Sequence, residues 1–98
     1  ITTSATIANH VIDSSSASTY RSAKYVVQVS SGTQFQIVEI LLIHNGTTVQ
    51  MTEYGLLCTE AAPIAAFDAD ISAGSLSLLA TPVNAVSTFK VVKTLIDV

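Results

Sequence analysis

Residues 34–58 read QFQIVEILLIHNGTTVQMTEYGLLC, two runs of alternating side chains that meet at Asn45-Gly46. Successive side chains of a strand point to opposite faces, so alternation of this kind is typical of strands rather than of helices. Asn-Gly between two such runs favours a two-residue type I′ turn, because that turn needs positive φ at both central positions. We therefore predict a β-hairpin over residues 34–57, with its turn at Asn45 and Gly46.

The first strand of this hairpin covers residues 34–44, and its later half is apolar on both faces. One face carries Phe35, Ile37, Leu41 and Ile43 together with Glu39, and the other carries Val38, Ile40 and Leu42. Such a strand lies in the middle of a packed sheet or is covered by a neighbouring subunit. In the second strand, Gly55 interrupts the alternation and predicts either a β-bulge or a close approach of another backbone.

Five further runs predict strands, and segments rich in turn residues separate them. They cover residues 6–12, 22–30, 67–71, 75–80 and 88–96. The small polar segment 13–18 predicts a loop, and segment 60–66, which contains Pro63, predicts a connection between two sheets.

About seven short strands without an amphipathic helix predict an all-β fold, specifically an antiparallel β-sandwich that is jelly-roll-like. A chain of 98 residues has room for a single domain. Within it we expect residues 1–19 to form an N-terminal strand or arm with a Ser-rich loop, and residues 20–98 to form the sandwich.

The composition limits the partners. Charged residues make up 11% of the chain, against a usual share of roughly 25%, whereas serine and threonine supply 24 of the 98 residues. Four Lys and Arg and a net charge of −3 give no basic stripe, so we expect no nucleic-acid partner. No apolar run approaches the ~18–20 residues that cross a bilayer, so we expect no membrane partner.

The residues that could carry chemistry are few. A metal site would need His10 and His44 to meet a carboxylate of Asp68 or Asp70, and nothing in their spacing requires this. Asp68 and Asp70 share one strand face but lack the further oxygen ligands and the glycine of a calcium loop. Cys58 follows two leucines, which is typical of a small core residue rather than of a nucleophile. We therefore predict no enzyme, no metal site and no cofactor.

Glu39 is the most conspicuous charge of the hairpin, because alternation places it between Ile37 and Leu41. An unpaired carboxylate is costly to bury, so the simplest expectation is a structural ion pair with Arg21 or Lys24, within the domain or across an interface.

Several runs, taken in order along the chain, resemble a module of virion structural proteins in tailed bacteriophages, especially T4-like marine cyanophages. They are RSAKYVVQV (21–29), EILLIHNGTT (39–48), TEYG (52–55), FDADI (67–71) and KVVKTLI (90–96). The resemblance implies a non-enzymatic β domain of the virion, assembled in the host bacterial cytoplasm, that serves as capsid decoration or as part of a neck, tail or fibre. It supplies no catalytic or cofactor-binding residues.

The low charge agrees with a chain that is covered by copies of itself, since homo-oligomer interfaces are more apolar than ordinary surfaces. We expect a homo-oligomer, with a trimer favoured, that also docks on other virion proteins. The expected contacts are the exposed ends of the strands within 22–58 and the amino-terminal segment. The alternative is a host-glycan-binding module of a phage fibre that uses Tyr20, Tyr54, Asn84 or Asp68, although sugar sites usually have a denser aromatic cluster with Trp.

Overall fold

The computed structural model describes residues 1–98, which form eight strands and no helix. The strands are β1 (Thr2–Thr3), β2 (His10–Ser16), β3 (Tyr20–Ser31), β4 (Gln34–His44), β5 (Val49–Cys58), β6 (Ala65–Ser72), β7 (Ser75–Pro82) and β8 (Ser87–Asp97). No part of the chain is a helix long and apolar enough to cross a membrane.

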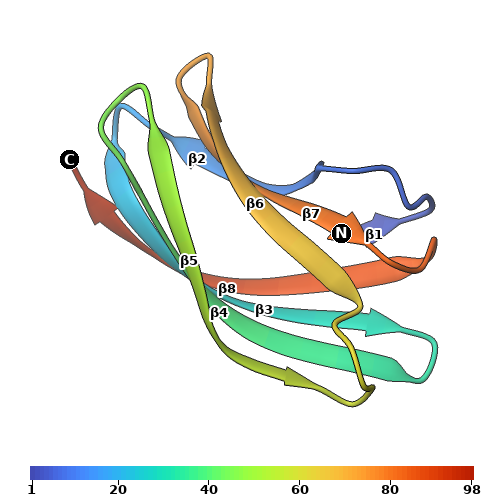
Figure 1. The fold of residues 1–98 in the computed structure, drawn as a ribbon. Coiled ribbons are helices and arrows are strands. Elements are labelled where there is room, and N and C mark those ends of the chain that lie inside the picture. Colours follow the sequence, from blue (N-terminus) through green and yellow to red (C-terminus); the bar gives the residue numbers. More distant parts are fainter.

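Two antiparallel sheets lie face to face, which confirms the predicted all-β sandwich (Figure 1). One sheet has the strand order β1-β8-β3-β4-β5 and the other has the order β2-β7-β6. The first strand pairs with the last and the second with the last but one, as in a jelly roll, whereas β3, β4 and β5 stay together as a meander in one sheet.

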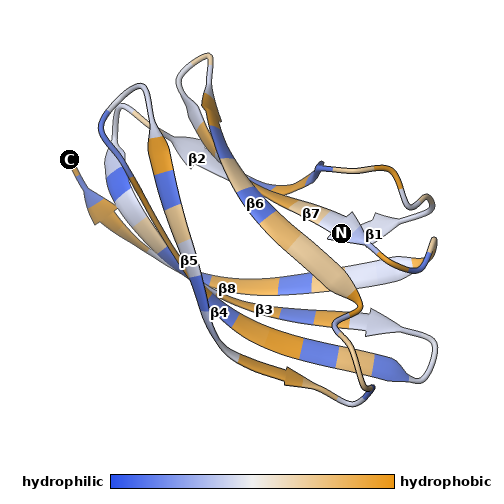
Figure 2. Cartoon of the chain, viewed as in Figure 1, coloured by the Kyte–Doolittle hydropathy of each residue, from blue (hydrophilic) through white to orange (hydrophobic).

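The core lies between the sheets. It follows from the alternation of hydrophobic and hydrophilic residues along the strands, which Figure 2 shows as changes of colour. The inward residues of the larger sheet include Tyr25, Val27, Val29, Val38, Ile40 and Leu42, and those of the smaller sheet include Phe67, Leu76, Leu78 and Ala80. Phe67 of β6 and Phe89 of β8 meet edge to face with ring centroids 6.2 Å apart, an arrangement that aromatic rings favour.

The 34–57 hairpin is confirmed, because β4 pairs with β5 from Gln36↔Cys58 to His44↔Val49. The predicted two-residue type I′ turn at Asn45 and Gly46 is wrong, since only Gly46 has positive φ. The loop instead spans residues 45–48, where Asn45 Oδ1 accepts hydrogen bonds from the backbone N–H groups of Thr47 and Thr48. An Asn side chain can cap a turn in this way without itself entering the left-handed region.

The β-bulge predicted at Gly55 is also present. Tyr54 faces Glu39 and Leu57 faces Ile37, so two residues of β5 lie opposite one residue of β4. Gly55 has φ +64°, the left-handed conformation that glycine adopts in bulges of this type.

The amino-terminal part differs from the prediction. The strand expected at residues 6–12 lies at 10–16 instead, and segment 13–18, expected as a loop, contributes most of it. Its serines form an edge strand whose backbone pairs with β7, so hydrogen bonds hold it in place rather than burial of an apolar face. Residues 1–19, expected as a strand or arm with a Ser-rich loop, contribute β1 to one sheet and β2 to the other.

Candidate functional site

The outer face of the five-stranded sheet carries an unusual number of exposed apolar side chains. On β4 they are Phe35, Ile37, Leu41 and Ile43, between 38% and 53% exposed. Neighbouring strands add Leu57 of β5 and Val92 and Ile96 of β8, each more than 60% exposed. We call these seven residues the outer apolar face.

The register shows how the residues of the outer apolar face are arranged across the strands. Ile37 pairs with Leu57 on β5, Ile43 pairs with Ser22 on β3, and Ser22 in turn pairs with Ile96 on β8. Cross-strand neighbours on one face have Cβ atoms about 4.5–5.5 Å apart, so Ile37 and Leu57 are close enough to touch, whereas Ser22 lies between Ile43 and Ile96.

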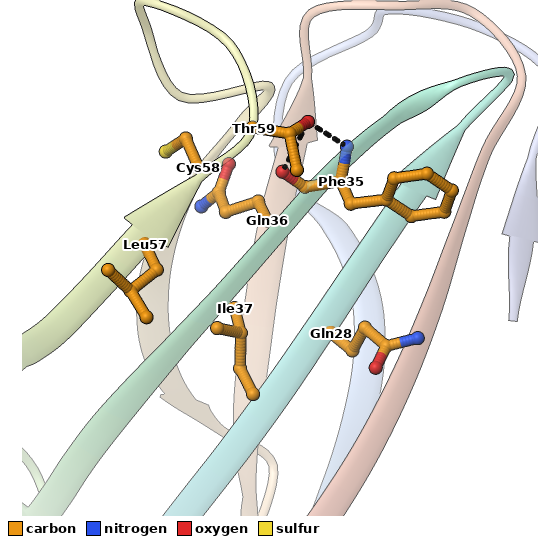
Figure 3. A pocket seen from close by; sticks show the side chains of 7 residues that line it. All are labelled: Gln28, Phe35, Gln36, Ile37, Leu57, Cys58 and Thr59. Carbon is orange, nitrogen blue, oxygen red and sulfur yellow. Dashed lines mark hydrogen bonds between the residues drawn. The ribbon is translucent and has the colours of Figure 1, made fainter.

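Two hollows lie on this face. A groove of about 560 Å³ at the end near Ile43 and Ile96 is also lined by Leu41 and the stem of Lys24. A smaller hollow of about 330 Å³ at the other end lies beside Ile37 and Leu57 (Figure 3). Carbon atoms make up most of the lining of each hollow. Each hollow lies between side chains that project from neighbouring strands.

The charges of this face are few. Glu39 pairs in register with Val26 of β3 and Tyr54 of β5, and its side chain extends over Gly55. Lys24 lies one strand and two residues away on the same face, opposite Leu41. Arg21 donates a hydrogen bond from Nη1 to the backbone oxygen of His44, at 3.1 Å.

Glu39 therefore makes no ion pair within the chain, where the one salt bridge joins Lys93 to Asp13. Lys24 is a diagonal neighbour of Glu39 on the adjacent strand, and Arg21 is engaged at the end of β4. The pairing of Glu39 across an interface stays a prediction.

The two histidines have structural roles. His44 is buried, and its Nδ1 accepts a hydrogen bond from the Gly46 N–H while its Nε2 donates to the oxygen of Tyr20, at 2.6 Å. His10 Nε2 lies 3.1 Å from the oxygen of Ala5. The structure brings together no group of three or more His, Cys, Asp or Glu side chains that could hold a metal.

The other sequence candidates are also dispersed. Asp68 and Asp70 are exposed on β6 of the smaller sheet, and Asp68 accepts a hydrogen bond from the next backbone N–H. Cys58 is half-buried at the end of β5, where the Thr59 hydroxyl bonds both backbone groups of Phe35 (Figure 3).

The candidates for a glycan site do not form one. Tyr20 begins β3, whereas Asn84 donates to Gln34 at the opposite end of that strand, at 2.7 Å. The length of β3 places these two ends about 35 Å apart. Tyr54 lies on the outer face of β5, and Asp68 belongs to the other sheet.

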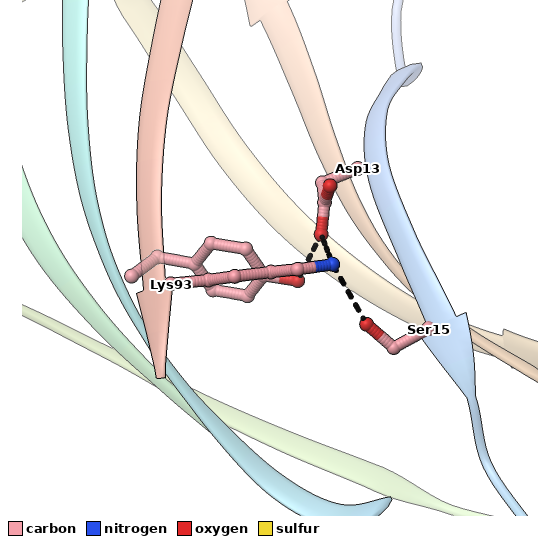
Figure 4. A network of polar contacts seen from close by, with 4 residues as sticks. Asp13, Ser15 and Lys93 are labelled. Carbon is pink, nitrogen blue, oxygen red and sulfur yellow. Dashed lines mark hydrogen bonds and ion pairs between the residues drawn. The ribbon is translucent and has the colours of Figure 1, made fainter. Parts of the chain in front are cut away.

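Sequence reasoning missed a polar network that joins the two sheets. Asp13 Oδ2 on β2 accepts a hydrogen bond from the Tyr25 hydroxyl at 2.7 Å and an ion pair from Lys93 Nζ at 2.9 Å, and Lys93 also reaches Ser15 (Figure 4). Burial, and then the hydrogen bond to Asp13, raise the pKa of Tyr25 above its usual range. The sequence signal for this network was one aspartate, Asp13, in a segment otherwise rich in serine.

Sequence reasoning also missed Gln36, which links β4 to the start of β6. Its side chain is buried, and Oε1 accepts hydrogen bonds from the backbone N–H groups of Ile64 and Ala65, at 2.7 and 3.2 Å. It thereby fixes the segment that crosses from β5 to β6. Glu53, close to that crossing, faces the gap between β5 and β6, and burial raises its pKa.

The polar side chains described above thus connect the strands and sheets of the sandwich. No other part of the chain covers the outer apolar face.

Comparisons of the chain with protein-family models, with curated proteins and with solved structures find no match.

Proposed function

We propose that the chain is a non-enzymatic structural domain of a phage particle, and that it assembles by packing the outer apolar face against the same face of a second copy. The observation that carries this proposal is the exposure of that face. Scattered exposed apolar residues are ordinary, but a contiguous set on one sheet face marks an interaction surface.

The size of the face suits a stable interface. With ~4.8 Å between strands and ~3.3 Å per residue, the four long strands present roughly 19 by 33 Å, or about 630 Å² in flat projection. Protruding side chains increase the accessible area beyond this. A standard interface buries about 800 Å² per partner, so one face of this sheet is sufficient.

A second copy is the favoured occupant because the face is self-complementary in chemistry. Its charges are Lys24, Lys90 and Glu39, so a copy brings a carboxylate and ammonium groups to the same surface. One face that covers itself forms a closed two-fold pair, whereas a trimer needs two different surfaces that fit each other. We therefore replace the expected trimer with a dimer as the basic unit.

The resemblance to virion modules supports the particle setting. A low-charge sandwich with one apolar face could serve as capsid decoration or in a neck, tail or fibre, in each case through protein contacts rather than chemistry. The main contact between copies is the outer apolar face rather than the amino-terminal segment, because β1 and β2 of that segment already pair with strands of the two sheets.

Sedimentation equilibrium of charged variants tests the proposal. Leu41→Glu places a carboxylate in the centre of the face and should shift the chain to monomer, with an unchanged far-ultraviolet circular dichroism spectrum. Val83→Glu is the matched control, because Val83 is 62% exposed in the β7–β8 loop, away from the face. Equal association of the wild type and Leu41→Glu would refute the assignment of this face.

A further inference from the structure

The outer face contains a diagonal row of four residues, one from each long strand. Moving one strand and two residues at each step, the row reads Ile96 on β8, Lys24 on β3, Glu39 on β4 and Leu57 on β5. The pairs that fix it are Ser22↔Ile96, Lys24↔Leu41, Val26↔Glu39 and Ile37↔Leu57.

The row has apolar ends and opposite charges at its two central positions. Ile96 is 64% and Leu57 is 71% exposed, and neither Lys24 nor Glu39 has an ion-pair partner within the chain. In both directions the row has the order apolar, charged, charged, apolar. From β8 the positive charge comes first, and from β5 the negative charge comes first. A two-fold rotation that reverses the row therefore places unlike charges together and apolar ends together.

We propose that the dimer two-fold axis crosses this row at right angles midway between Lys24 and Glu39, so that each Lys24 pairs with Glu39 of the second copy and each Leu57 packs on Ile96 of the second copy. This inference rests on the proposed function, and it specifies the geometry and the polar contacts of that interface.

The lattice of the sheet supports this axis beyond the row itself. With ~4.8 Å between strands and ~3.3 Å per residue, the rotation leaves Val26 and Leu41 within a few ångströms of their own copies, beside the axis. It also lays Ile37 over Thr94 and Tyr54 over Ser22 of the second copy. The strands of the two faced sheets then cross at about 70°, nearer to the orthogonal than to the aligned class of sheet packing.

The same rotation explains the positions of the charges. The Glu39 carboxylate extends over Gly55, with Oε2 3.7 Å from where a Cβ would be, and the glycine has no side chain to cover it. The Lys24 stem lies along the groove beside Leu41, so its ammonium group can reach outward from the sheet. Lys90 rotates beyond the edge of β8 and faces no acid, so it belongs to the rim of the interface.

Charge reversal tests the pairing. Lys24→Glu and Glu39→Lys should each raise the dimer Kd at least about tenfold, because each places two like-charged contacts at the interface. The double variant K24E/E39K should restore the Kd to within about threefold of the wild type. Lys90→Glu makes the same charge change on the same face and should leave the Kd within about threefold.

A crosslink tests the apolar ends of the row. In a Cys58→Ser background, Leu57→Cys combined with Ile96→Cys should form a disulfide-linked dimer under mild oxidation. The two positions lie about 24 Å apart within one chain, far beyond the ~7 Å between Cα atoms that a disulfide spans, so no link can form within a copy. Leu57→Cys combined with Val83→Cys is the control and should stay uncrosslinked.

The outcomes separate this inference from the proposed function. A wild-type chain that stays monomeric overturns both. A wild-type dimer that Leu41→Glu disrupts, but in which Lys24→Glu behaves like Lys90→Glu and Leu57→Cys with Ile96→Cys gives no crosslink, keeps the face as the interface and overturns the proposed axis.

Discussion

Asp13 is the side chain that ties β2 of the smaller sheet to both Tyr25 and Lys93 of the larger sheet. We consider Asp13→Ala, which deletes the acceptor of both the Tyr25 hydroxyl and the Lys93 ammonium group. Tyr25 is fully buried, so after the substitution its hydroxyl loses its 2.7 Å acceptor and has little access to bulk water. Lys93, by contrast, is about one third exposed and can regain hydration.

The magnitude follows from this difference in exposure. An orphaned buried hydroxyl costs about 1–3 kcal/mol, and a partly exposed ion pair contributes about 0–1 kcal/mol. We therefore expect Asp13→Ala to lower the free energy of unfolding by about 2–3 kcal/mol and Lys93→Ala by less than about 1 kcal/mol. Adding Tyr25→Phe to Asp13→Ala removes the orphaned hydroxyl and should recover about 1 kcal/mol.

Urea unfolding followed by far-ultraviolet circular dichroism at 25 °C gives these free energies. All variants must be compared at one protein concentration, because association stabilises the folded chain by mass action. The reasoning fails if Asp13→Ala is no more destabilising than Lys93→Ala, or if Tyr25→Phe makes Asp13→Ala less stable still.

Three further predictions concern stability and use the same assay. Gln36→Leu leaves two backbone N–H groups of the β5–β6 crossing without their acceptor and should cost roughly 2–4 kcal/mol, whereas a loss below 1 kcal/mol would show that the crossing does not depend on it. Gly55→Ala makes only an ordinary contact, 3.7 Å from Glu39 Oε2, but forces a side chain into the left-handed region, so it should cost about 1–2 kcal/mol, and an unchanged stability would argue against the bulge. Because the pKa of Tyr25 is raised in the folded state, the folded chain keeps this proton when the unfolded chain loses it. Its stabilisation is therefore complete below about pH 10 and falls above that pH by up to about 1.4 kcal/mol per pH unit. The wild type should accordingly lose stability more steeply than Tyr25→Phe between pH 9 and pH 11, and parallel curves would contradict the shift.

Much of the fold could be predicted from local patterns. The hairpin over 34–57 and the bulge at Gly55 follow from alternation and from the backbone freedom of glycine. The turn type was wrong, because the Asn45 side chain satisfies two backbone N–H groups and so makes a four-residue loop stable. A positive-φ pair of the kind expected there occurs instead at Ala73 and Gly74.

The serine-rich strand β2 could not be predicted in this way. Its place depends on pairing with β7, whose residues lie 59 to 70 positions from their partners in β2, and on Asp13 meeting Tyr25 and Lys93. Interactions of this kind leave no periodic pattern in the strand itself. The apolar nature of both faces of β4 was visible, but only the register showed that its outer face continues onto β5 and β8.

The mass of the wild-type chain in solution, measured by multi-angle light scattering over a concentration series, tests the central claim most directly. Coverage of the outer apolar face by a second copy predicts twice the 10.2 kDa of one chain at high concentration, falling toward 10.2 kDa on dilution. A mass of 10.2 kDa at every concentration would contradict the claim that this face is an interface between copies.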